Sequence, residues 1–215
     1  GGELFKPGTA LPAVNNETGV AALEMLKKVL GYANPDILTH NTPTATGEWE
    51  AGNVALMMMW SSRTSGLMDA KGSEPVVYEN TRVGPPMTVA GGTIPTSALW
   101  WDGWAVAENI SDEDAAASFV AMKNGTSPSI LNDETMGQTV WLIEGYEPAP
   151  VNLPVLAAIE MGTRRWPATP YIGIMNGAAG KEIADFITGK QDAASTLADI
   201  EAAYEASAIE KGFLE

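Results

Sequence analysis

The sequence predicts an α/β fold, because stretches with helical periodicity alternate with short apolar runs of strand length and no hairpin signal joins those runs. The composition is typical of a globular protein: of 215 residues, 45% are hydrophobic and 18% are charged. A chain of this length can bury a substantial core, as one large domain or two small ones.

The first predicted helix covers residues 15–32. It opens with a capping residue and ends near Gly31, and its apolar residues recur at helical spacing. These residues are Val20, Leu23, Leu26 and Leu30. A loop rich in Pro, Thr and Asn follows, and then a short helix around 48–52.

An apolar run, "NVALMMMW" at 53–60, has the length of a strand and is predicted to be buried. A capped short helix is expected after it, at 61–71. From 75 to 107 the chain is rich in β-branched residues and is punctuated by Gly and Pro, which favours further strands.

The second half is predicted to be mainly helical. Ser111 caps a helix that carries acids in its first turn and stops at Gly125. The remaining predicted elements, in chain order, are a helix at 132–145, a proline-rich crossing at 146–154, a short helix at 153–162, a loop at 163–173, and two helices between 176 and 212, broken at 188–193.

The charge balance and the missing residue types exclude several classes of protein. With 27 acidic against 12 basic residues the net charge is −15, which disfavours binding to nucleic acid or to an anionic membrane surface. The chain has no Cys, so disulfides, thiolate catalysis and Cys-based zinc sites are excluded. No apolar run approaches the roughly 20 residues of a membrane span. Neither a metal nor a cofactor is expected.

Catalytic groups are scarce as well. His40 is the single histidine and lies in a Thr- and Asn-rich loop, where a solvated side chain is the simpler explanation. Glu144 and Glu147 flank a Gly-Tyr turn and are more simply surface acids than a glycosidase pair. We therefore predict no catalytic residue.

The tryptophans point to a binding site. Trp60 ends the predicted strand, where α/β folds place ligand-contacting residues. In "LWWDGW", alternation sends Trp100, Asp102 and Trp104 to one face and Trp101 to the other. A core would not place a carboxylate between indoles, so this face is expected to meet a polar ligand. Pyranose rings suit such a surface, because their C–H faces pack on indole and their hydroxyls pair with charged groups.

The order of the motifs resembles the family 1 extracellular solute-binding proteins of ABC importers, the sugar-binding group that includes maltose-binding protein. The resemblance rests on "GGELF" before the first helix, "EWEAGNVALMMMW", "WDGWAVAENISDEDAAASFVAMKNGTS", "APVNLPVL" and the closing "ITGKQDAASTLADIEAAYEASAIEKG". The "WWDGW" and "RRWP" segments depart from the family pattern.

The resemblance implies a two-lobe fold like that of type II periplasmic binding proteins, present here only as its C-terminal half. The first residues, "GGELFKPGTA", have no Met and no signal-peptide pattern, which agrees with a missing upstream part. The expected division is an incomplete C-terminal lobe at 1–98 and 156–215, a helical part of the other lobe at 106–150, and hinge crossings at 99–105 and 148–156. Apolar faces left uncovered could make such a truncated chain associate.

The implied function is capture of a sugar or polyol outside the cytoplasm and delivery to an ABC permease, without catalysis. The expected location is the periplasm, or the cell surface through a lipid anchor. The ligand-binding residues predicted from the indole pattern and the resemblance are Trp60, Trp101, Asp102, Trp104, Arg165, Trp166 and Asn176. Two alternatives stay open from sequence: a carbohydrate-active hydrolase using Asp or Glu, and a polyamine binder of the same fold.

Overall fold

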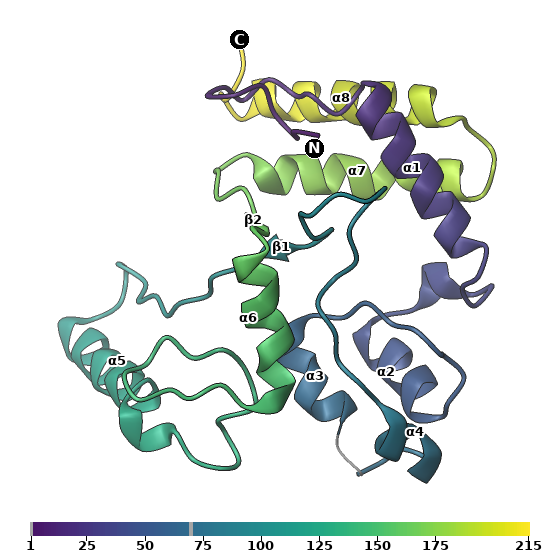
Figure 1. Ribbon diagram of the computed structural model, residues 1–215. Helices are drawn as coiled ribbons and strands as arrows, with labels where there is room; N and C mark the ends of the chain where they lie inside the picture. The colour runs from purple at the N-terminus through teal and green to yellow at the C-terminus, as the bar shows by residue number, and fades with distance from the viewer. Residues whose placement is uncertain (1, 69–70) are drawn as a thin grey trace. The chain divides into compact units, whose positions relative to one another are not determined.

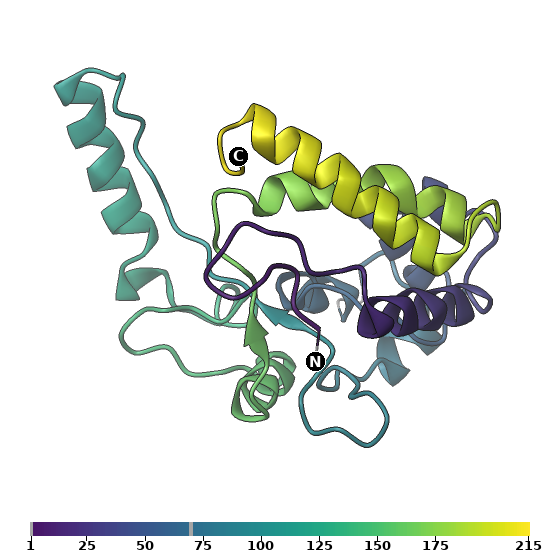
Figure 2. The same ribbon diagram turned by 90° about the horizontal axis from the view of Figure 1, so that it is seen from above.

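The computed structural model describes residues 2–68 and 71–215 (Figures 1 and 2). The chain divides into two compact units. One consists of Gly1–Thr39 with Pro167–Glu215, and the other of His40–Trp166. The sequence predicts lobes at 1–98 with 156–215 and at 106–150, joined by hinge crossings at 99–105 and 148–156. These bounds differ from those of the two compact units, and the lobes and hinges stay predictions.

The first unit is built on two helices that lie side by side, α7 (Ile172–Ile187) and α8 (Ala193–Glu210) (Figures 1 and 2). Helix α1 (Glu17–Leu30) packs against α8. All three helices contribute apolar side chains to one core, because each keeps an apolar face at helical spacing. The largest buried members of this core are Leu23, Met175, Phe186, Leu197, Ile200 and Tyr204.

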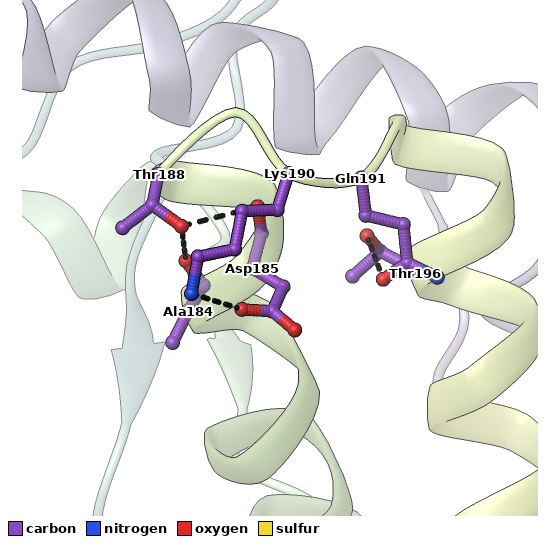
Figure 3. Close-up of polar contacts among 6 residues, drawn as sticks. All are labelled: Ala184, Asp185, Thr188, Lys190, Gln191 and Thr196. Carbon is purple, nitrogen blue, oxygen red and sulfur yellow. Dashed lines mark hydrogen bonds and ion pairs between the residues drawn. The ribbon is translucent and has the colours of Figure 1, made fainter.

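Polar contacts close the turn between α7 and α8 (Figure 3). The Thr188 hydroxyl donates to the Ala184 carbonyl at 2.9 Å, and Lys190 pairs with Asp185 at 3.1 Å. At the start of α8, Asp192 accepts hydrogen bonds from the backbone N–H and the hydroxyl of Ser195, which lower the pKa of the Asp192 carboxyl. The bond to the Ser195 N–H satisfies a donor of the first turn of α8 that has no partner within the helix.

The N-terminal loop is fastened to this helix pair by side chains. The Tyr171 hydroxyl donates to the Thr9 carbonyl at 2.9 Å, and the Tyr204 hydroxyl donates to the Ala10 carbonyl at 2.6 Å. The Glu201 carboxylate accepts the N–H groups of Val14 and Asn15, each at 2.9 Å. Side chains of α7 and α8 thus provide the partners that a neighbouring strand would otherwise supply.

The second unit consists of short helices joined by long irregular segments. Helices α2 and α3 pack together, α4 packs on α2, and the 3₁₀ helix η3 contacts both α3 and α6. The bounds are α2 Thr42–Glu50, α3 Ser61–Leu67, α4 Pro75–Asn80, β1 Ala98–Leu99, α5 Asp112–Gly125, η2 Pro128–Ile130, η3 Pro150–Asn152, α6 Leu153–Glu160 and β2 Arg164–Arg165. A further 3₁₀ helix, η1 (Ile37–Thr39), ends the N-terminal segment of the first unit.

Asn152 organises the irregular segment that precedes η3. The side chain is 1% exposed, and its amide nitrogen lies 3.2 Å from the Met136 carbonyl, 3.0 Å from the Thr139 carbonyl and 2.8 Å from the Tyr146 hydroxyl. Because two of these partners are carbonyls, which only accept, the orientation of the amide is determined. One buried side chain therefore fixes the path of residues 136–146.

The helix predictions at 15–32, 111–125, 153–162 and 176–212 are confirmed, and the short helix around 48–52 is the end of a longer α2. Helix α3 confirms the prediction at 61–71 within the described residues, since 69–70 lie outside them. A capping side chain marks the start of α1, α2, α5 and α8. The cap expected for the helix at 61–71 is absent, since no side chain caps α3, and α6 and α7 also begin without one.

The strand prediction for 53–60 is wrong. These residues form no regular structure, and Leu56 and Met58 are 90% and 63% exposed. An apolar run forms a strand only where another strand pairs with it. None of the described residues pairs with 53–60. At 75–107 the chain begins with helix α4, for which Pro75 at the first turn is a start signal, and its one strand is β1.

The helix prediction for 132–145 is also wrong. Turns occupy this segment. The Asn152 amide donates to the Met136 and Thr139 carbonyls, and the Trp141 indole N–H donates to the Thr135 carbonyl at 2.8 Å. Those carbonyls would otherwise accept helical hydrogen bonds. The described part of the chain is therefore richer in helix, and poorer in strand, than the α/β prediction implied.

Replacing Asn152 tests its organising role. Asn152→Asp places a carboxylate oxygen against two carbonyl oxygens in a buried position, so we expect a loss of about 2–4 kcal/mol in unfolding free energy. Urea unfolding measures it. The control is Asn124→Asp at an exposed position of α5, which should change stability by less than about 0.5 kcal/mol. Equal stability of the two variants would contradict the assignment.

Tyr204 gives a pH-dependent test of the loop attachment. Burial, and then the nearby Tyr171, raise the pKa of Tyr204 above 10.0. The folded state therefore favours the neutral phenol, and this stabilisation is full below pH 10.0 and lost as the pH rises through the folded pKa. Tyr204→Phe should cost about 1 kcal/mol at pH 7, from the hydrogen bond to Ala10, and less above pH 10.

Urea unfolding followed by circular dichroism at the two pH values measures this difference. Tyr32→Phe is the matched control, since the Tyr32 side chain is 87% exposed in the same unit. A Tyr204→Phe penalty that does not change with pH would show that ionisation of Tyr204 is not coupled to folding.

Candidate functional site

The segment "WWDGW", residues 100–104, is called here the indole segment. It has no regular secondary structure and every one of its residues is exposed. Trp101 and Trp104 are 76% and 72% exposed, and Trp100 is 57% exposed. Large aromatic side chains are normally buried, so adjacent exposed indoles are typical of a surface that receives a ligand or a partner.

A short parallel ladder starts this segment. Strand β1 pairs with β2 so that Ala98 faces Arg164 and Leu99 faces Arg165, and the Trp166 N–H donates to the Leu99 carbonyl at 2.9 Å. Continuing this register by one residue places Trp100 beside Trp166. Their rings are stacked, with centroids 4.8 Å apart and planes 15° from parallel.

The predicted residues Trp101, Asp102 and Trp104 follow directly. The Trp101 ring lies against Gly103, where a Cβ atom would come within 3.4 Å of it. Asp102 is exposed between the indoles, and Arg165 is exposed on β2. An exposed carboxylate and an exposed guanidinium group thus lie next to tryptophans in the sequence.

The other predicted residues lie apart from this ladder in the sequence. Trp60 is 60% exposed and precedes the first residue of α3, in the same compact unit as the indole segment. Asn176 is exposed on α7, in the other unit. Within the part of the chain that the structure describes, Trp60 makes no ring contact with the other tryptophans.

Trp100 was missing from the predicted site. Alternation placed Trp100 on the same face as Asp102 and Trp104, but nothing local in the sequence indicated its contact with Trp166. The signal that could have found it is the similarity of "ALW" and "RRW", in which two residues of extended chain precede a tryptophan that can stack when the two stretches pair.

Two hollows lie elsewhere on the molecule. One, of about 430 Å³ beside α2 and α3, includes Glu50 and Arg63 in its walls. Another, of about 360 Å³ beside the N-terminal loop, includes Lys6, Glu201 and Glu205. No aromatic side chain of the described residues lines either hollow, so both differ in character from the indole segment.

Two further searches concern other classes of protein. In residues 2–68 and 71–215, no three His, Cys, Asp or Glu side chains are grouped so that they could hold a metal ion. None of the helices in those same ranges has the length and apolarity needed to cross a membrane.

Comparison with models of protein families shows which family the chain belongs to. The model of the family described as "Bacterial extracellular solute-binding protein" matches residues 3–139, more than half of the chain. A search of curated proteins found no match. Members of this family bind a small-molecule solute in the periplasm or at the cell surface for an ABC permease, and they are not catalysts.

The mixed helical architecture is compatible with a periplasmic-binding-protein fold, although strands are few in the described residues. The expectation of a bacterial ABC solute-binding protein is confirmed, as is the expectation that the protein is not an enzyme. No comparison supports the hydrolase alternative. The chain belongs to the bacterial extracellular solute-binding protein family, whose members bind a solute for ABC import.

Proposed function

We propose that the solute is a carbohydrate or a polyol, and that the indole segment contacts it. The observation that carries the proposal is the exposure of the indoles: Trp101 and Trp104 leave 76% and 72% of their surface accessible, with Asp102 between them. A ligand that covers such rings removes apolar area from water, at about 25 cal/mol per Å².

The chemistry of the surrounding groups supports a polyhydroxy ligand. Axial C–H groups of a sugar pack on an indole face, while Asp102 accepts hydrogen bonds from hydroxyls and Arg165 donates to ring or hydroxyl oxygens. Trp60 and Asn176 complete the proposed set, from the start of α3 and from α7. Asn176 is assigned from the family resemblance. Trp60 was predicted also from its place at the end of a strand, and because residues 53–60 form no strand, the resemblance alone now supports it.

Transport follows from closure in this proposal. The two lobes, 1–98 with 156–215 and 106–150, close over the ligand about crossings at 99–105 and 148–156. The first crossing contains the indole segment, so ligand contact and hinge rotation involve the same residues. The closed form would be the form that the permease recognises.

Two substitutions in the complete protein test the site. Trp104→Ala and Asp102→Asn should each weaken saccharide binding by about 5- to 150-fold, equivalent to about 1–3 kcal/mol. Both side chains are exposed, so the melting temperature should stay close to that of the wild type. Calorimetric titration with maltose, trehalose and sorbitol, and thermal melting of the same samples, measure the two effects.

The control is Trp141→Phe in the same unit. Trp141 is partly buried and donates its indole N–H to the Thr135 carbonyl, so this change should lower stability and leave affinity unaltered. Normal affinity with a lower melting temperature in Trp104→Ala would identify the indole segment as a packing element and refute the proposal.

A further inference from the structure

We propose that Trp100 presents the indole face on which the ligand ring lies, and that Trp166 is a positioning residue that holds Trp100 in place. This assignment rests on the proposed carbohydrate function and deepens it. It also reverses the sequence prediction, which included Trp166 in the binding site and omitted Trp100.

The stacked geometry separates the two roles. With ring centroids 4.8 Å apart and planes at 15°, each indole covers one face of the other. Trp100 still leaves 57% of its surface accessible, whereas Trp166 is partly buried. The outer face of Trp100 is therefore the open face of the pair, and a sugar ring arriving from solvent meets it first.

The backbone explains why Trp166 can act as the support. It follows β2, whose pairing with β1 and the N–H bond to Leu99 fix its main chain. Just before β2, the buried Thr163 donates its hydroxyl to the Ala158 carbonyl at 2.6 Å, which ties the strand to the end of α6. Trp166 thus stands on an anchored main chain.

Trp100 has the opposite setting. It leaves the ladder at the end of β1 and begins a stretch, 100–110, in which every residue is exposed. An indole on such a chain has free rotamers, and ordering it at the moment of binding would weaken affinity. Stacking on Trp166 orders the ring beforehand, so the binding surface is preorganised before the ligand arrives.

The stacking of Trp100 on Trp166 can be detected without any ligand. Two stacked indoles give an exciton couplet in far-ultraviolet circular dichroism, so the couplet should be present in the wild type and in Trp104→Ala, and lost in both Trp100→Ala and Trp166→Ala. Hydroxyl-radical footprinting of the wild type should oxidise Trp100 faster than Trp166. A couplet that survives Trp166→Ala would overturn the stacking of the two rings. Equal oxidation of the two rings would overturn the assignment of Trp100 as the open face.

Ligand binding then separates contact from support. With maltose, trehalose or sorbitol as the probe, Trp100→Ala and Trp166→Ala should each weaken binding about 10-fold, whereas Trp166→Phe, which keeps an aromatic support, should stay within about 2-fold of the wild type. Bound saccharide should protect Trp100 from oxidation and leave Trp166 unchanged.

Protection of Trp166 instead of Trp100, or failure of Trp166→Phe to restore affinity, overturns the division of roles even where sugar binding itself is intact. If the wild type binds none of the three probes while a different class of solute protects the indole segment, the proposed carbohydrate function fails. Protection of Trp100 by that solute would still support its role as the contacting ring.

Discussion

The candidate site depends on the pairing of β1 with β2. Two residues on each side are sufficient to bring together parts of the chain that are distant in sequence, and their register decides which tryptophan stacks on which. A parallel pair of this length contributes little stability alone. Its position is secured by Thr163 and the end of α6, so the geometry of the indoles is set by contacts that lie outside the indole segment.

Side chains supply many of the hydrogen-bond partners that neighbouring strands supply to the backbone in a strand-rich protein. Tyr171, Tyr204 and Glu201 hold the N-terminal loop on one unit, and Asn152 holds the turns before η3 on the other. Irregular backbone is tolerated when its carbonyl and N–H groups find such partners. Each of these anchors is a single side chain, which makes the loops sensitive to substitution at a few positions.

The helices could be predicted from the sequence because the signals are local. Asn16, Ser111 and Asp192 cap their helices, and apolar spacing marks the buried faces. The strands could not, because a strand depends on a partner elsewhere in the chain. For the same reason the sequence indicated an aromatic site around Asp102 and left Trp100 out, since its contact with Trp166 arises from pairing between distant residues.

The division into two units has a spectroscopic consequence. All 7 tryptophans lie between His40 and Trp166, so the unit formed by α1, α7 and α8 contains none of them. Intrinsic indole emission therefore reports on one unit alone, while much of the helical dichroism comes from the long α7 and α8 of the other. Denaturation followed by both signals distinguishes a molecule that unfolds as one cooperative body from one whose halves melt separately.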